Sequence, residues 1–275
     1  MWSNRGTVLC AALALSLLSL SAGSGLALTI AVDGNPSDWG IAPGPWGASD
    51  WVPLPGVQGV WGGTEDYRPG TNGGFVAPGY GGQLFDAEAL YFTYGDAYAY
   101  FAVVTGFPPE GTQGNVAGDI ALDIGADGTW DYGIETTGNR GNVRGGLYEN
   151  IHWGNGLWGA ATNPAEILTG SLAWAPTFSS LSYTAIGNEH YFIETAVPLD
   201  ALSRSTMQPT SFQANWTMSC GNDGVRATGQ LPPSPQEFQS VIPEPATCTI
   251  LGSGVLALLA LRARRKARQP KPTPS

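Results

Sequence analysis

Hydrophobic and polar residues alternate over several stretches in the middle of the chain, which is the pattern of strands that bury one face. The clearest pair is FDAEALYFTYGD at 85–96 and AYAYFAVVTG at 97–106, which meet at a Gly-Asp turn and predict a β-hairpin. A second hairpin is predicted from the runs at 119–124 and 129–135, which flank an Ala-Asp-Gly turn. Further strands are predicted at 170–174, 182–186, 190–197 and 212–218.

The residues before the first hairpin have a weaker pattern. Leu28, Ile30 and Val32 alternate and then enter a turn at 33–36, which predicts an edge strand capped by a tight turn. From about 41 to 82, Gly, Pro and Trp prevail with little periodicity, so a large loop system with short strands is expected. A helical period appears only at VPLDALSRST, residues 197–206. Many short strands joined by Gly-rich turns predict an all-β fold, a single β-sandwich over residues 28–242.

Composition agrees with this fold class. Hydrophobic residues make up 43% of the chain and charged residues 12%, so the chain has enough apolar material for a core. Its 39 Gly and 21 Pro suit turns between strands better than helices. Residues 28–242 contain 21 Asp and Glu against five Arg and no Lys, an excess of 16 negative charges. Such a surface repels polyanions, which excludes nucleic acid as a partner.

The first 27 residues have the pattern of a secretory signal peptide. A short region with Arg5 precedes an apolar stretch from Val8 to about Leu20, and small residues follow. Cleavage is expected after Ala27, with Ala22 as the alternative. A buried N-terminal helix would explain the hydrophobicity but not the missing polar face. The chain is therefore expected to enter the Sec export machinery, with residues 1–27 as a signal helix.

The C-terminal end contains a second apolar segment. Residues 246–261 form a run of 16 residues followed by an Arg and Lys cluster, slightly short of the roughly 20 residues of a comfortable membrane span. The basic flank favours a cytoplasmic end, which leaves the acidic domain on the other side of the membrane. A permanent transmembrane anchor would account for these features, but not for the Pro-Glu-Pro triplet at 243–245.

Pro243, Glu244 and Pro245, the Gly-containing apolar run and the Arg cluster together resemble a PEP-CTERM sorting signal over residues 243–268. The resemblance implies that an exosortase-like membrane protease reads the three residues and cleaves there. It also implies a protein that is exported, transiently anchored in the inner membrane and then released to the cell envelope or the exterior. Residues 269–275, beyond the usual basic end, would form a short cytoplasmic tail.

Cysteine use fits an exported domain without a disulfide. Cys10 lies in the expected signal peptide and Cys248 in the tail, so only Cys220 belongs to residues 28–242. No intrachain disulfide can form after both ends are processed. The core has to supply the stability.

The domain itself has a second, shorter resemblance. VDGNPSDW at 32–39, the hairpin at 85–106 and YFIETAVPLDAL at 191–202 resemble the ordered motifs of DOMON-like and family 9 carbohydrate-binding-module-like sandwiches. The resemblance covers roughly residues 28–224 and implies a jelly-roll type of sandwich. Such folds mostly bind sugars, sometimes with structural calcium, although a fold alone does not establish a function.

The strongest candidate for sugar binding is the segment YENIHWGNGLWG at 148–159. His152, Trp153, Asn155 and Trp158 are expected in a Gly-rich loop where nothing forces burial. Aromatic faces stack on sugar rings, and amides hydrogen-bond to hydroxyl groups. The alternative is that the aromatic residues pack the core or the loop, as most of the domain's nine Trp are expected to do.

Calcium is the one cofactor that the sequence suggests. Asp123, Asp127 and Asp131 flank the turn of the second hairpin and would converge there, and calcium prefers several carboxylate oxygens. The spacing differs from an EF-hand loop, so a solvated Asp-Gly turn is the alternative. Asp86 and Glu88, at alternate positions entering a strand, are a further pair for a metal or a sugar.

Catalytic motifs are missing from the sequence. His152 and His190 are far apart, and neither a zinc spacing nor a Gly-x-Ser-x-Gly elbow occurs in the domain. The expected function is therefore non-catalytic, either binding of polysaccharide or a part of an extracellular matrix. The alternative is a secreted polysaccharide-active enzyme, a glycoside hydrolase or lyase, because a glycosidase needs only two suitably placed carboxylates.

Overall fold

The computed structural model describes residues 30–41, 51–54, 59–64, 81–156, 163–187 and 189–235. Within them, all regular structure except short 3-10 turns is β, in two antiparallel sheets, which confirms the all-β prediction. The first sheet has the strand order β1-β2-β3-β9-β8, with β1 at Trp61–Thr64, β2 at Ala87–Tyr94, β3 at Tyr98–Thr105, β9 at His190–Pro198 and β8 at Leu181–Gly187. The second has the order β11-β10-β4-β5-β6-β7, with β11 at Gly224–Leu231, β10 at Thr210–Thr217, β4 at Ile120–Ile124, β5 at Tyr132–Ile134, β6 at Leu147–Asn155 and β7 at Pro164–Trp174.

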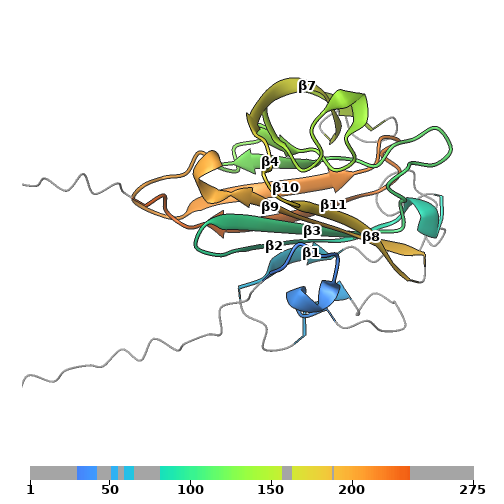
Figure 1. Ribbon diagram of the computed structural model, residues 1–275, viewed down its shortest axis with the longest axis horizontal. Helices are drawn as coiled ribbons and strands as arrows, with labels where there is room; N and C mark the ends of the chain where they lie inside the picture. The colour runs from blue at the N-terminus through green and yellow to red at the C-terminus, as the bar shows by residue number, and fades with distance from the viewer. Residues whose placement is uncertain are drawn as a thin grey trace, which may run out of the picture. The chain divides into compact units, whose positions relative to one another are not determined.

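The main core lies between the two sheets. Leu90 and Phe92 of β2 and Phe101 of β3 pack there against Phe212 and Trp216 of β10. Phe92 and Phe212 meet edge to face, with ring centroids 4.4 Å apart. Figure 1 shows the sheets as stacked layers, with β4 and β10 in one and β2 and β3 in the other. The hydrophobic residues at alternate positions of the predicted strands are therefore the residues that face this core.

The first sheet is covered on its outer face as well. The residues of β2 and β3 that point away from the main core pack in a second cluster with side chains of the N-terminal segment. This cluster comprises Ile30, Trp39, Ile41, Trp51, Ala89, Tyr91, Ala102, Val104 and Phe192. Burial on both faces explains why β2 is apolar at nearly every position instead of strictly alternating.

The expected edge strand at 28–32 is wrong for its described part, because Ile30 to Val32 form no strand. The chain instead turns into a 3-10 helix at Pro36–Trp39, where Asn35 caps the first turn by accepting from the Ser37 N–H. Pro36 favours this start because it lacks an N–H and its φ is already set for a helix. The tight turn was predicted correctly, and the segment covers the sheet without joining it.

Both hairpins are confirmed. β2 pairs antiparallel with β3 across the Gly95-Asp96 turn, and β4 pairs with β5 around the Asp-Gly turn. The other predicted strands correspond to β7, β8, β9 and β10, of which β7 begins six residues earlier than expected. The helical period at 197–206 gives only a 3-10 turn at Leu199–Ala201.

Two strands were not predicted. Residues 147–155, which were expected to be part of a Gly-rich loop, form β6, so that prediction is wrong. Several register shifts against β7 and the positive φ of Asn150 (53°) break the alternation and conceal the strand in the sequence. β11 contains Gly224 and Gly229, and a Cβ on Gly229 would lie 2.7 Å from the Phe212 ring. Close packing therefore requires glycine at this position. The same glycine weakens the hydrophobic pattern from which a strand would be predicted.

The second sheet curls at its β6–β7 end, as Figure 1 shows for β7. Gly133 of β5 permits this, because a Cβ there would lie 2.6 Å from Trp153 and 2.9 Å from Ile167. Side chains of β6 and β7 thus cover the neighbouring strand β5. The curl brings the end of β6 and the start of β7 next to the loops that form the candidate site.

The described residues end at 235, shortly after β11, where Arg204 donates hydrogen bonds to the carbonyls of Pro232 (2.8 Å) and Pro233 (3.1 Å). Cys220 is a free, buried cysteine. The signal helix at 1–27, the sorting residues Pro243, Glu244 and Pro245, and the C-terminal transmembrane helix lie outside the described residues. In the part of the chain that is described, no helix has the length and hydrophobicity to cross a membrane.

Candidate functional site

An open pocket of about 220 Å³ lies where four segments of the chain meet. These segments are the loop after β3, the end of β6, the start of β7 and the residues after β10. The lining consists of Gly114, Asn115, Gly154, Asn155, Ala165, Glu166 and Ser219. Its functional groups are therefore two amides, one hydroxyl and one carboxylate, separated by positions with little or no side chain.

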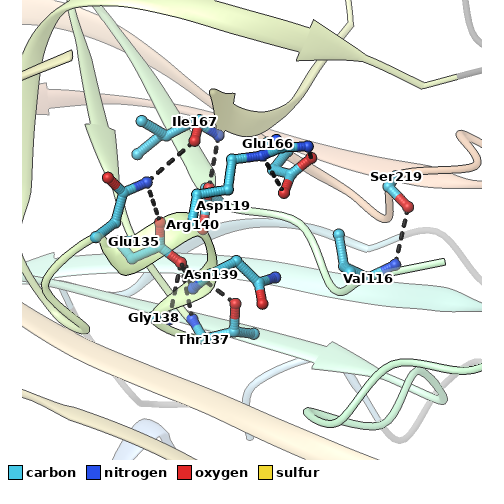
Figure 2. Close-up of polar contacts among 11 residues, drawn as sticks. Val116, Asp119, Glu135, Thr137, Gly138, Asn139, Arg140, Glu166, Ile167 and Ser219 are labelled. Carbon is cyan, nitrogen blue, oxygen red and sulfur yellow. Dashed lines mark hydrogen bonds and ion pairs between the residues drawn. The ribbon is translucent and has the colours of Figure 1, made fainter. Parts of the chain in front are cut away.

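Strand pairing and loop hydrogen bonds position these groups. Gly154 is paired with Glu166, and Asn155 with Pro164, across the β6–β7 ladder. The Ser219 hydroxyl accepts a hydrogen bond from the Val116 N–H at 2.9 Å, and the Ser219 N–H donates to the Val116 carbonyl at 3.0 Å (Figure 2). The two loops are thus tied to each other beside the pocket, and the pocket does not depend on a single loop.

Glu166 forms a bidentate ion pair with Arg140. The guanidinium donates from Nε to one carboxylate oxygen at 2.9 Å and from Nη2 to the other at 3.1 Å (Figure 2). The Glu166 side chain is only 12% exposed, whereas that of Arg140 is 51% exposed. The hydrogen bond and the charge of Glu166 raise the pKa of Arg140 above its ordinary value. Such a fork fixes the orientation of the carboxylate.

Arg140 reaches Glu166 from a loop that is built around Glu135. One oxygen of the buried Glu135 carboxylate accepts hydrogen bonds from the backbone N–H groups of Thr137 (3.2 Å), Gly138 (2.9 Å) and Asn139 (3.3 Å). The other oxygen accepts from the Asn142 amide at 2.9 Å, and the same amide donates to the Ile167 carbonyl at 3.0 Å. Arg140 has a φ of 56°, a left-handed conformation that is unfavourable for a residue with a side chain. The loop around Glu135 stabilises this conformation.

A third carboxylate, Asp119, lies in the same cluster. Its two oxygens accept hydrogen bonds from the Thr136 N–H (2.9 Å) and the Ile167 N–H (2.8 Å), and its side chain is fully buried. Burial raises the pKa of Asp119 well above its ordinary value, the charges of Glu135 and Glu166 add to the increase, and the two hydrogen bonds oppose it. We call Asp119, Glu135, Glu166 and Arg140 the acid cluster; Figure 2 shows its members together.

Of the three predicted ligand-binding residues that the structure describes, Asn155 lines the pocket and the other two do not. His152 is an exposed residue of β6 opposite Thr169, and Trp153, opposite Ile167, packs over Gly133. The expectation of a loop is wrong for His152, Trp153 and Asn155, because all three belong to β6. Trp158 lies outside the described residues. Glu166, Asn115 and Ser219 were not predicted, since residues of four separate segments give no local spacing signal.

The acidic hairpin contains the three predicted calcium ligands. The Asp123 carboxylate accepts from the N–H groups of Asp127 (3.0 Å) and Gly128 (2.8 Å), and that of Asp131 accepts from the Ile124 N–H (2.8 Å). Burial raises the pKa of Asp131, and the charges of Asp127 and Asp123 contribute in the same direction. Among the residues that the structure describes, no group of three or more His, Cys, Asp and Glu has a metal-binding arrangement. Calcium at this turn stays a hypothesis.

The pair Asp86 and Glu88 is buried under the N-terminal segment. A carboxylate oxygen of Glu88 hydrogen-bonds with Nε2 of the buried His190 at 2.9 Å, and the Asp86 carbonyl accepts a hydrogen bond from the Thr105 hydroxyl at 2.6 Å. Trp51 packs on the His190 ring with centroids 4.9 Å apart. These contacts connect β2, β3 and β9. Asp86 and Glu88 therefore lie in the interior of the domain and do not line the pocket.

The pocket combines groups that hydrogen-bond to hydroxylated ligands with one carboxylate held in a fixed orientation. Asn155 and Asn115 offer donors and acceptors, and the Ser219 hydroxyl can still donate while it accepts from Val116. Comparisons of the chain with models of known protein families, with curated protein sequences and with solved structures found no match.

Proposed function

We propose that the protein is an exported component of the cell envelope or the extracellular matrix whose β-sandwich binds carbohydrate without modifying it. The expected signal peptide at 1–27 and the PEP-CTERM-like residues 243–268 support export and sorting by an exosortase-like protease. The motifs at 32–39, 85–106 and 191–202 support a jelly-roll, DOMON-like form of the sandwich. The two packed sheets agree with such a form.

Carbohydrate binding rests on one observation, the convergence of Asn115, Asn155, Glu166 and Ser219 on one open pocket. Sugars are bound through many hydroxyl groups, each of which donates and accepts, and amides, hydroxyls and carboxylates are the side chains that satisfy them. The groups lie on paired strands and on mutually bonded loops, which reduces the entropy lost on binding.

The arrangement of the carboxylates supports binding over catalysis. A glycosidase requires two carboxyl groups on either side of the scissile bond. Glu166 is the one carboxylate among the described residues that line the pocket, and Arg140 bonds to both of its oxygens. Asp119 is buried, and both of its oxygens accept backbone N–H groups. A second carboxyl group that faces a substrate is therefore not part of the described pocket.

The test is a binding assay with the full chain in detergent on a panel of immobilised polysaccharides. Retention without release of reducing ends supports the proposal, and release of reducing ends favours the polysaccharide-active enzyme. Asn155→Ala should reduce retention, whereas Gln208→Ala, which removes an exposed amide elsewhere, should not. Retention by none of the polysaccharides would contradict the proposal.

Export and sorting need a separate measurement. The mass of the protein in membrane and medium fractions of the producing cell should correspond to a chain that begins near residue 28 and ends near residue 243. Recovery of the intact chain from the cytosol would contradict this part of the proposal.

A further inference from the structure

Glu166 is the only ionisable side chain among the described residues that line the pocket. The other lining side chains are amides, a hydroxyl and a methyl group, and two positions are glycine. A carboxylate has about four acceptor positions, of which the Arg140 fork uses two. Glu166 can therefore accept hydrogen bonds from a ligand while its ion pair with Arg140 stays intact.

The acid cluster around this carboxylate contains three acidic side chains and one cation. Asp119 and Glu135 are both buried. The charges of Glu135 and Glu166 raise the pKa of Asp119, which shows that the three acids lie close together. Arg140 is the one cation of the acid cluster, and half of its side chain is exposed to solvent. Because the Glu166 side chain is mostly buried, solvent screens the charge of Arg140 more than that of Glu166. The excess of 16 negative charges over residues 28–242 acts in the same direction.

We infer that the pocket binds a saccharide unit that carries a protonated amine, with Glu166 as its counter-ion. The inference rests on the proposed function and adds the chemical class of the sugar. An ammonium group can donate three hydrogen bonds, and a charge-assisted bond to a carboxylate is stronger than one from a hydroxyl. A sugar that carries a carboxylate would instead be repelled by Glu166 and by the field of the acid cluster.

The shape of the pocket agrees with a charged group in place of a stacked ring. Gly114 has a φ of 78°, and a Cβ at this position would meet no atom within 4 Å, so the pocket is open on that side. No aromatic residue belongs to the described lining. Hydrogen bonds and charge, and not stacking, therefore supply the affinity that the described part of the pocket can give. Such affinity depends strongly on salt.

The experiment measures binding of four soluble ligand types by calorimetry, with the full chain in detergent at about pH 6, below the usual pKa of an α-amino-type amine. The ligands are oligomers of glucosamine, of N-acetylglucosamine, of glucose and of a uronic acid. Glucosamine oligomers should bind about tenfold more tightly than the neutral ones, and oligouronates should bind most weakly. The preference should shrink when salt is raised from about 0.01 M to about 0.15 M. Glucosamine monomer, measured in parallel, distinguishes recognition of one unit from recognition of a chain.

Glu166→Gln should abolish the preference for the amine while leaving neutral oligomers bound. Asp96→Asn, which removes one exposed negative charge from the turn between β2 and β3, should keep the preference. Equal binding of amine and neutral oligomers, or tighter binding of oligouronates, by the unmodified chain would overturn the inference and leave the proposed function intact. Binding of no saccharide would overturn both. The ligand series decides the question even if Glu166→Gln fails to fold.

Discussion

Glu194 and Trp39, 155 residues apart in the chain, are joined by a buried hydrogen bond of 2.8 Å from the indole Nε1 to the carboxylate. The second oxygen of Glu194 accepts the backbone N–H groups of Asp33 and Gly34, each at 2.9 Å. One carboxylate in the middle of β9 thus holds the backbone at Asp33 and Gly34 and also the side chain at the end of the 3-10 helix. Burial raises the pKa of Glu194, and the same three hydrogen bonds oppose the shift.

Replacing Glu194 by Gln should destabilise the protein. An amide has only one acceptor oxygen, so either the Trp39 indole or the two backbone donors would lose their acceptor. A buried donor without an acceptor costs about 1–3 kcal/mol. Urea unfolding of the full chain in detergent, followed by Trp fluorescence, measures the change in the free energy of unfolding.

A double-mutant cycle isolates this contact. Trp39→Phe alone loses packing and the hydrogen bond, but in the presence of Glu194→Ala, which removes both carboxylate oxygens, it removes an indole that has no acceptor. The two changes should therefore cost less together than the sum of the single changes, with a coupling of about 1 kcal/mol or more. Strict additivity would show that the hydrogen bond does not stabilise the fold.

Stability should fall as the pH rises from about 4, the ordinary pKa of a carboxyl group, through the raised pKa values of the folded protein. Asp119, Asp131 and Glu194 all have a raised pKa in the folded protein. In the pH range between the unfolded and the folded pKa values, the folded state therefore binds more protons than the unfolded state. Folding is favoured where these groups are protonated, and the advantage is lost as the pH rises through the folded values. Thermal unfolding across this range gives the slope directly.

Asp119→Asn tests the main contributor to this slope. The variant loses one acceptor for a backbone N–H, which changes its stability at every pH, so the informative quantity is the slope. Its stability should depend less on pH than that of the unmodified chain, because Asn does not titrate. The exposed control Asp96→Asn should leave the slope unchanged. An unchanged slope in Asp119→Asn would contradict the assignment.

Gly118, which precedes Asp119, should tolerate no side chain. A Cβ there would lie 1.7 Å from the Thr217 carbonyl oxygen, so the backbone of two neighbouring segments would have to separate. Gly118→Ala should cost about 2–3 kcal/mol or prevent folding. Gly95→Ala is the matched control, since its Cβ would meet only the Tyr100 ring at 3.8 Å. Equal melting temperatures of the two variants would contradict the close approach.

Substitutions of Arg140 can separate the effect of its backbone conformation on stability from the effect of its ion pair. Arg140→Gly and Arg140→Ala both remove the bond to Glu166, but only Ala has to adopt the positive φ of 56° with a Cβ. Arg140→Gly should therefore melt about 2–4 °C above Arg140→Ala. The reverse order would mean that the loop does not keep this conformation in solution.

The calcium hypothesis predicts a rise in melting temperature. A cation at the turn would offset the repulsion among Asp123, Asp127 and Asp131, and a ligand that binds only the folded state stabilises it by mass action. At about 100 times the dissociation constant the gain would be about 2.7 kcal/mol. Asp127→Asn should reduce the response. The absence of any shift at millimolar calcium would rule the site out.

The local hairpins could be predicted from the sequence because the information lies within a few neighbouring residues. In β2–β3 the alternation and the Gly95-Asp96 turn occur together, and nothing interrupts the ladder near the turn. β6 was missed for the opposite reason. Asn150 at positive φ and the register shifts against β7 reverse the faces of successive residues, so the segment has no constant period.

The candidate site was largely beyond prediction from the sequence. Asn155 was selected because it stands among aromatic and Gly residues, and it does line the pocket. Arg140 and Glu166 are 26 residues apart, and their pairing depends on a loop conformation that Glu135 stabilises from inside the fold. Such tertiary contacts leave no spacing pattern. A buried carboxylate can be distinguished from a solvated one only when the surrounding strands are known.

If the chain is exported as proposed, the N-terminal segment would link folding to the removal of the signal peptide. Ile30, Trp39 and Ile41 are buried against the outer face of the first sheet, and they follow the expected cleavage site after Ala27 by 14 residues or fewer. On the proposed route, these residues would stay tethered close to the bilayer until the leader is cleaved. Completion of the second cluster would then wait for removal of the leader, which makes cleavage a late folding step as well as a maturation step.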